Sequence, residues 1–286
     1  MRIGFAAIPY DKKLLPVTSK KSAGQTMERL MDVARYVNGL GIDFYRIPAN
    51  ISPHESMESL ELARDDIIAL GALFKKFNIR TCFHATYYCI LNSPKPEVLE
   101  NSIKELQCMC FYDRLTNGGN HIEIHAGGVY GDRQGSMDRL IDNVLKLDEP
   151  IIKMLRFENE EHPGKLGTVD ELWYLNHEAG IPLVFDVAHY RVNLLNKKMP
   201  VREIAETFLG TWKGASTFPV LHFSTIKGNI GTHLPVDPHE FWYLMDELHG
   251  LKFDVMLETK EKERDVLKVK SFKNWDLCPQ QASSGL

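Results

Sequence analysis

The chain has 286 residues, of which 44% are hydrophobic and 25% charged, so it can bury a large core in one barrel-sized domain or in two smaller ones. This composition excludes a fibrous or disordered protein. The net charge of −4 gives no general attraction to nucleic acid, so a nucleic-acid partner would need a local basic surface.

The first residues and the cysteines indicate the compartment. The stretch "MRIGFAAIPYDKK" does not have the form of a secretory leader, and no apolar run approaches the roughly 18 residues of a membrane span. The five cysteines form no CxxC pair, which is typical of free thiols in a reducing compartment. We therefore expect an unprocessed, cytoplasmic, monomeric protein with no membrane partner.

Eight short apolar runs alternate along the chain with longer stretches of helical periodicity, such as 56–77 and 93–115. This alternation predicts an α/β fold, a single (β/α)8 TIM barrel over residues 1–270, with 271–286 as a flexible tail. The runs occupy residues 2–8, 43–47, 79–84, 121–125, 151–158, 181–186, 218–223 and 253–258.

Polar side chains stand at the ends of six consecutive runs, and in a TIM barrel the strand ends open into the catalytic mouth. One such residue alone would be a hydrogen-bonded histidine or a helix-capping carboxylate. Together they predict a metal centre, because unpaired carboxylates and imidazoles crowded into one mouth would be strained by repulsion and desolvation. With two histidines just beyond the runs, the candidate ligands are His84, His125, Glu158, Asp186, His189, His222, His233 and Glu258.

This ligand set indicates the number and type of ions. Three carboxylates and five imidazoles exceed the three or four protein ligands of one catalytic ion, so two or three divalent ions are expected. A nitrogen and oxygen set without thiolate is compatible with manganese or zinc. Such ions can activate water for displacement at phosphorus, which favours phosphodiester hydrolysis. The same ligands could serve a sugar isomerase, so the ligands leave both enzyme classes open.

Basic residues gather in the loops after the first, seventh and eighth runs, which would all open on the metal side. Phosphate contacts from these loops would make DNA binding salt-dependent. Lys260 is the sharpest candidate, because it lies two residues beyond Glu258 and could reach a scissile phosphate. The set comprises Lys12, Lys13, Lys20, Lys21, Lys227, Lys260, Lys262 and Arg264.

Seven segments resemble, in order and spacing, the signature segments of the UV damage endonuclease family, and the match runs from residue 2 to about 265. The resemblance implies a xylose-isomerase-like TIM barrel with a cluster of divalent ions, manganese first and zinc or magnesium as alternatives. It also implies nicking of duplex DNA immediately 5′ to cyclobutane dimers and 6-4 photoproducts, without ATP. The segments are "FYRI", "FHATYYCILNSP", "IEIHAGGVYGDR", "LRFENEE", "PLVFDVAHY", "PVLHFST" and "DVMLETKEKE".

The resemblance also divides the ligands among three ions, with Glu158 as a bridge between the first two. Where the family has a carboxylated lysine, this chain has Val220. The implied catalytic residues are Glu158, His222 and Lys260. The first ion would take His84, His125 and Glu158, the second Glu158, Asp186, His222 and Glu258, and the third His189 and His233.

Lesion recognition is implied for Tyr87 and Tyr88, which match a glutamine-tyrosine pair that the family inserts into damaged DNA. A second aromatic exchanges hydrogen bonding for stacking, which is worth ~1–3 kcal/mol per base. Further candidates for DNA or lesion contact are Phe5, Arg46, Asn92 and Lys227.

Three alternatives stay open at this point. The first is an apurinic endonuclease of the endonuclease IV type, on a similar barrel with similar ligands. The second is a sugar isomerase or epimerase. Such an enzyme would need neither the basic residues around the mouth nor aromatic residues that insert into DNA. The third is a non-catalytic DNA-binding barrel with structural metals.

Overall fold

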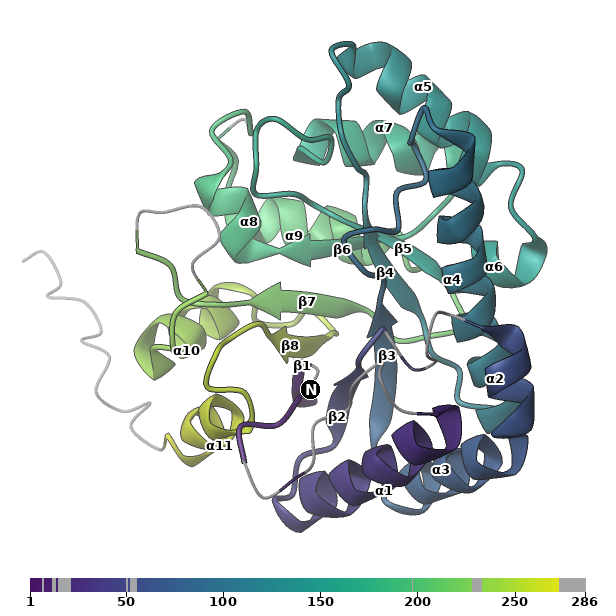
Figure 1. Ribbon diagram of the computed structural model, residues 1–286. Coiled ribbons are helices and arrows are strands. Elements are labelled where there is room, and N and C mark those ends of the chain that lie inside the picture. The colour runs from purple at the N-terminus through teal and green to yellow at the C-terminus, as the bar shows by residue number, and fades with distance from the viewer. Residues whose placement is uncertain are drawn as a thin grey trace, which may run out of the picture.

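A closed barrel of eight parallel strands forms the centre of the protein (Figure 1). The computed structural model describes residues 1–6, 8–11, 14, 22–49, 51, 56–196, 198–227 and 233–272. Each strand pairs with its neighbours in chain order, and the last pairs with the first, which confirms the predicted TIM barrel. The strands are β1 (Ile3–Ala6), β2 (Phe44–Ile47), β3 (Arg80–His84), β4 (Ile122–His125), β5 (Leu155–Glu158), β6 (Leu183–Asp186), β7 (Val220–Phe223) and β8 (Asp254–Leu257).

Helices surround the strands on the outside of the barrel (Figure 1). Among the described residues, no helix is both long enough and apolar enough to span a bilayer. The helices are α1 (Ala23–Gly39), α2 (Met57–Leu62), α3 (Arg64–Lys76), α4 (Pro96–Thr116), α5 (Arg133–Val144), α6 (Glu149–Met154), α7 (Val169–Ala179), α8 (Val187–Val192), α9 (Val201–Gly210), α10 (Pro238–Glu247) and α11 (Glu263–Ser271).

Strand alternation divides the side chains between the barrel interior and the surrounding helices. Tyr45 of β2 faces outward, where its ring stacks on Phe74 of α3. Inside the barrel, β2, β3, β7 and β8 each carry an apolar residue two positions before a polar one. With Ala6 of β1, these four apolar residues build a floor beneath the mouth. The floor consists of Ala6, Phe44, Cys82, Val220 and Met256.

Two predicted elements differ from the structure. The run at 151–158 was expected to be one strand, but its first part lies in α6 and only Leu155–Glu158 is extended. Pro150 explains the difference, because a proline without an N–H group is well suited to the first turn of a helix. The helical stretch at 56–77 is divided at Ala63 into α2 and α3. Residues 273–286 lie outside the described residues, so the flexible tail stays a prediction.

Candidate metal centre

The eight predicted ligands gather at the mouth of the barrel. Parallel register sets His125 beside Glu158 and Asp186 beside His222, so side chains from neighbouring strand ends meet. Three sets have ligand atoms within 4.8 Å of one another. They are His84, His125 and Glu158; Glu158, Asp186, His189 and Glu258; and His189, His233 and Glu258.

His222 joins the same cluster from β7. Its Nδ1 atom lies 3.2 Å from Oε2 of Glu158 and 3.4 Å from Oε1 of Glu258. Glu158 is therefore central to the cluster. It approaches His84 and His125 with its carboxylate, and it also approaches His222. The bridging role of Glu158 that the resemblance implies stays a prediction.

The turn after β6 places Asp186 and His189 together. Asp186 is the N-cap of α8, and one of its carboxylate oxygens accepts a hydrogen bond from the backbone N–H of His189 at 2.7 Å. The amide side chain of Asn159 exchanges two hydrogen bonds with the backbone of Asp186, at 2.7 and 2.9 Å. Nδ1 of His189 lies 2.9 Å from the Asn159 carbonyl, which fixes the orientation of the ring. This hydrogen-bonded turn holds both ligands before any ion is bound.

The charges of the cluster depend on one another. Burial would raise the pKa of the Glu158 carboxyl, but His222 and His125 lower that pKa well below its ordinary value. Burial also favours neutral His222, yet Glu158 and Glu123 raise the pKa of its imidazole well above 6.5. The pKa of Asp186 is raised by burial, with a further contribution from Glu158 and Glu258. In the absence of cations, carboxylates and imidazolium groups therefore compensate for one another.

Four atoms of the candidate ligands lack hydrogen-bond partners, and they show whether cations fit the site. The four atoms are buried and accept or donate no hydrogen bond among the described residues, although buried polar atoms in proteins are nearly always paired. Divalent ions would complete their coordination, so the donor set fits a cluster of such ions. The atoms are Oε1 of Glu158, Oδ2 of Asp186, Nδ1 of His125 and Nδ1 of His222.

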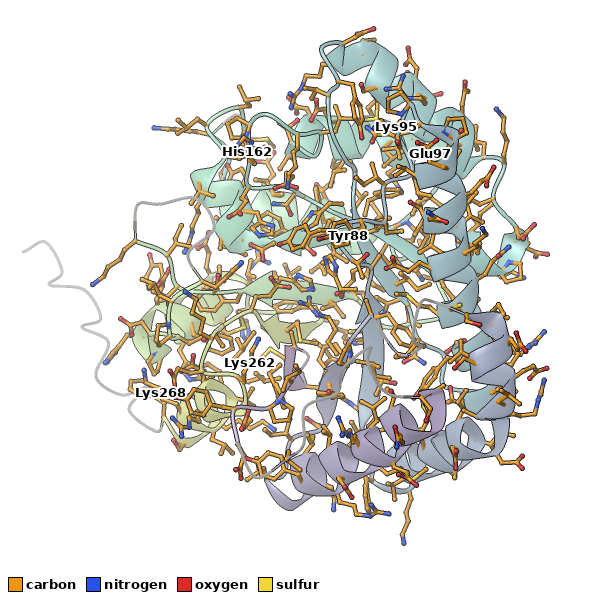
Figure 2. All side chains as sticks on the ribbon, viewed as in Figure 1. Tyr88, Lys95, Glu97, His162, Lys262 and Lys268 are labelled. Atoms are coloured by element: carbon orange, nitrogen blue, oxygen red, sulfur yellow. The ribbon has the colours of Figure 1, made fainter. Side chains whose placement is uncertain are left out.

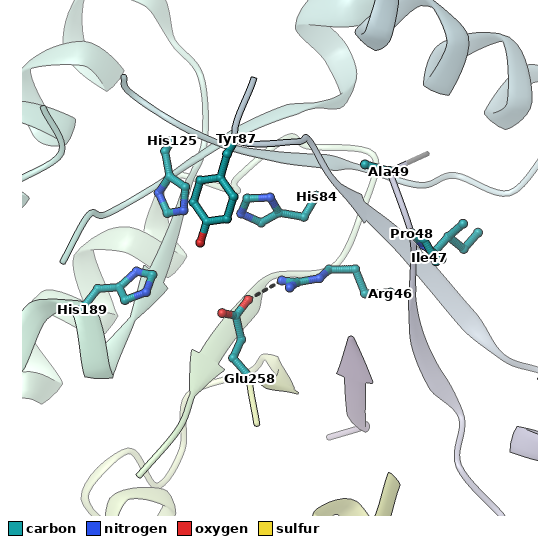
Figure 3. Close-up of a pocket in the computed structure, with 9 residues that line it drawn as sticks. All are labelled: Arg46, Ile47, Pro48, Ala49, His84, Tyr87, His125, His189 and Glu258. Atoms are coloured by element: carbon teal, nitrogen blue, oxygen red, sulfur yellow. Dashed lines mark hydrogen bonds and ion pairs between the residues drawn. The ribbon is translucent and has the colours of Figure 1, made fainter. Parts of the chain in front are cut away.

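A small cavity opens above these ligands (Figure 3). The rings of His84 and His125 are neighbours, with centroids 5.2 Å apart, and the ring of Tyr87 is seen against both of them in Figure 3. The Tyr87 and His125 rings are nearly parallel, with centroids 6.3 Å apart. Tyr87 and Tyr88 are 78% and 84% exposed, so both aromatic side chains face solvent, and Tyr87 lines the cavity. The cavity has a volume of about 160 Å³ and is lined by Arg46, Ile47, Pro48, Ala49, His84, Tyr87, His125, His189 and Glu258.

Two predicted lesion contacts are corrected by the structure. Phe5 faces the helices, where its fully buried ring meets Tyr45 edge to face at 5.4 Å, because strand alternation turns it out of the barrel. Asn92 is also fully buried, and its side chain donates a 2.7 Å hydrogen bond to the carbonyl of Gly128. Asn92 therefore connects the loops after β3 and β4 and does not reach the mouth.

Arg46 does line the cavity, but its guanidinium is already paired. It forms ion pairs with Glu258 and, at 3.4 Å, with Glu123. Its side chain is 14% exposed. Arg46 is therefore placed to orient carboxylates at the base of the mouth, whereas the sequence predicted a contact with DNA.

The structure describes some of the basic residues predicted in the loops around the mouth. Lys227 and Lys260 are exposed, whereas Lys262, labelled in Figure 2, is half-buried at the N-cap of α11. Burial lowers the pKa of the Lys262 ammonium, with a further contribution from Arg46. The guanidinium of Arg264 lies over the ring of Tyr10 at 3.6 Å from its centroid. Lys12, Lys13, Lys20 and Lys21 lie outside the described residues.

Sequence reasoning missed Glu123, a fully buried carboxylate two residues before His125 on β4. The alternation in "HIEIH" was the available signal, because residues 121, 123 and 125 must point to the same side of a strand. Oε1 of Glu123 lies 3.1 Å from Nε2 of His222. Val220, at the position of the family's lysine, packs in the apolar floor with Cys82 and Met256.

Comparisons with known proteins identify the family and the fold. The family model "UV-endonuclease UvdE" matches residues 12–280. A UV DNA damage endonuclease of Bacillus velezensis is 29% identical over 248 residues, which cover 82% of this chain and 76% of the relative. The crystal structure of SacUVDE superposes with a TM-score of 0.82 and 25% identity, covering 94% of this chain and 96% of that one.

A more distant structure shows the same fold. Endonuclease IV from Thermus thermophilus has a TM-score of 0.60 at 17% identity, covering 96% of this chain and 98% of that one. The likeness at this identity concerns the barrel alone. Since the family model covers most of the chain, from before α1 to beyond α11, this protein belongs to the UV-endonuclease UvdE family.

Proposed function

We propose that this protein is a DNA repair endonuclease that nicks duplex DNA 5′ to ultraviolet photoproducts and depends on divalent metal ions. Family membership supports a nuclease that acts on UV-damaged DNA. The observation that carries the finer proposal is the cluster of eight buried or half-buried ligand-type residues at the mouth, next to the exposed Tyr87.

The proposed cofactor is a cluster of two or three divalent ions, with manganese first and zinc or magnesium as alternatives. When bound, such ions supply an activated water and stabilise charge at the reacting phosphate. Glu158 would hold two ions together, and His222 would complete the second site. Glu258 faces Arg46 with one carboxylate oxygen and His233 with the other, at 3.9 Å, so it can ligate an ion while remaining oriented by the guanidinium.

The exposed residues around the mouth would bind and open the damaged duplex. Tyr87 and Tyr88 would stack in the gap left by the altered nucleotides, because an exposed aromatic face can replace a lost base neighbour. Lys227 and Lys260 would contact phosphates. Lys262 is the additional cation, since it lies within electrostatic reach of Glu258 and Arg46.

A nicking assay tests the proposal. Metal-stripped protein is incubated with manganese, magnesium or zinc and a duplex carrying one cyclobutane dimer, one abasic site or no damage. We expect nicking immediately 5′ to the dimer, with loss of at least roughly 100-fold in rate for Glu158→Gln, because the bridging carboxylate is replaced by a neutral amide. Asp113→Asn is a matched control, since Asp113 is a half-buried carboxylate near the end of α4 whose hydrogen bonds go to Asn120, before β4 and away from the mouth.

Other outcomes would assign the protein to one of the alternatives. Cleavage at the abasic site without any nick at the dimer would indicate an apurinic endonuclease. Metal binding with no cleavage of any duplex would instead favour a sugar isomerase or epimerase, or a DNA-binding barrel with structural metals. DNA affinity would separate those two.

A further inference from the structure

We infer that Glu123 is a positioning residue of the metal centre, because its buried carboxylate fixes both His222 and Arg46, and Arg46 in turn orients Glu258. The inference rests on the proposed metal-dependent function. It assigns a role to a residue that touches neither the DNA nor an ion.

The first contact of Glu123 is with His222. The two nitrogens of His222 face in opposite directions: Nδ1 approaches Glu158 at 3.2 Å, and Nε2 approaches Oε1 of Glu123 at 3.1 Å. Although this separation is short, Nε2 forms no hydrogen bond with any of the described residues. An imidazole that binds a metal through one nitrogen usually donates its other N–H to a carboxylate, which fixes the tautomer and the ring orientation. Glu123 therefore selects Nδ1 of His222 as the ligand atom.

The second contact of Glu123 is with Arg46. Nη1 of Arg46 lies 3.4 Å from Oε2 of Glu123 and forms a closer ion pair with Oε1 of Glu258 (Figure 3). Side chains of Glu123 and Glu258 are 0% and 13% exposed, so water screens these interactions weakly. Glu123 therefore helps to hold the guanidinium of Arg46, and the guanidinium holds Oε1 of Glu258. Oε2 of Glu258 remains directed toward His233.

The same carboxylate could be interpreted as part of a separate metal site. Cys82, His121 and Glu123 are fully buried and offer donor atoms within 4.8 Å of one another. However, Oε1 of Glu123 already contacts Nε2 of His121 at 3.0 Å, and its other oxygen faces Arg46. A cation added there would lie close to the guanidinium. The contacts therefore indicate that Glu123 pairs with a cationic group and with N–H groups. They do not favour Glu123 as a metal ligand.

Substitution of Glu123 by glutamine tests the inference. The amide keeps the shape of the side chain but removes the charge and one acceptor. We expect Glu123→Gln to bind manganese about 10–100-fold more weakly in equilibrium dialysis, the usual effect of losing a residue that orients a metal ligand. Glu263→Gln is the matched control, because Glu263 is equally buried and accepts hydrogen bonds from the backbone of Tyr10 and Asp11. Cys82→Ser should leave the metal content unchanged.

The tautomer of His222 gives a readout that a purely structural role would not change. In zinc-loaded, ¹⁵N-histidine-labelled protein, we expect Nε2 of His222 to carry the proton and Nδ1 to show the shift of a metal-bound nitrogen. In Glu123→Gln the two signals should broaden or exchange, whereas Glu263→Gln should match the wild type. The wild-type spectrum alone decides the assignment if the variant does not fold. A protonated Nδ1 in the wild type would overturn the inference.

The measurements separate this inference from the proposed function. If the wild type binds metal and shows the expected tautomer but nicks no damaged duplex, the function is wrong and the role of Glu123 stands. If the wild type nicks DNA but Glu123→Gln binds metal as tightly as Glu263→Gln, only the role of Glu123 is overturned. A wild type without affinity for divalent ions would overturn both. A metal lost in Cys82→Ser would replace the positioning role by a separate site.

Discussion

Individual residues at the barrel mouth combine two kinds of environment. The ligand candidates are buried or half-buried among opposite charges, whereas Tyr87, which lines the cavity beside them, and its neighbour Tyr88 are largely exposed. Burial makes the ligand cluster sensitive to the loss of any one charge. Exposure leaves the tyrosines available to a large substrate at little cost in stability.

Removal of the two aromatic rings should separate lesion recognition from metal binding. We expect Tyr87→Ala and Tyr88→Ala each to weaken binding to a dimer-containing duplex by about 5–150-fold, because a stacked base contributes ~1–3 kcal/mol. Manganese affinity should be unchanged, since neither phenol is among the ligand candidates. Fluorescence anisotropy with damaged and undamaged duplexes gives the comparison. Equal losses on both duplexes would mean that the tyrosines contact DNA without reading the damage.

Acid sensitivity should follow from His121. Burial lowers the pKa of its imidazole from 6.5 to about 4, against the opposing effect of Glu123. Between these values the unfolded chain binds a proton that the folded chain does not, so the free energy of unfolding falls as the pH falls from 6.5 to about 4. The loss is at most about 3 kcal/mol. Urea titrations across this range should show a shallower decline for His121→Gln, and an unchanged decline would contradict the assignment.

At the scale of elements, short loops and helix caps hold the mouth. α7 begins with a capping box in which Thr168 and Glu171 each bond the other's backbone N–H. Glu171 also pairs with Arg133 at the start of α5. The loop after β5, which follows Glu158, is therefore fastened at its far end to two helices.

Loss of the α7 cap should cost stability without removing metal ligands. We expect Thr168→Ala to lower the free energy of unfolding by about 1 kcal/mol, because the N-terminal N–H groups of the helix lose their side-chain acceptor. Thr168→Ser keeps the hydroxyl and should retain most of the stability. Chemical denaturation of the three proteins without metal is the measurement. An equal loss in both variants would show that the methyl group, and not the hydrogen bond, matters.

The whole molecule brings ligands from six strands into one cluster, so metal binding and folding should be linked. Ions that bind only the folded barrel stabilise it by about 4 kcal/mol when the free metal is a thousandfold above Kd. Chelation should therefore lower the Tm by roughly 8 °C. Differential scanning calorimetry with and without manganese tests this. Glu158→Gln should show a much smaller shift, and an equal shift would place the stabilising ions elsewhere.

The sequence predicted the barrel, and the gathering of the candidate ligands at its mouth, for one physical reason. Parallel strands of a closed barrel end on the same face, so polar residues at the ends of apolar runs had to meet there. The same rule did not reveal which side of a strand a nearby residue faces, which is why Phe5 was misassigned and Glu123 was missed. Burial of Asn92 depends on a contact with a distant loop, at Gly128, and no local pattern carries that information.

Closure of the barrel completes the proposed metal centre late in synthesis. Glu258 follows β8, the strand that completes the ring by pairing with β1, and the other proposed ligands lie on or after β3 to β7. During synthesis, the ribosome must therefore release almost the whole described chain before the last carboxylate joins the cluster. On the proposed function, a nascent chain without β8 lacks one of the proposed ligands, so it should not cut DNA before the barrel has closed.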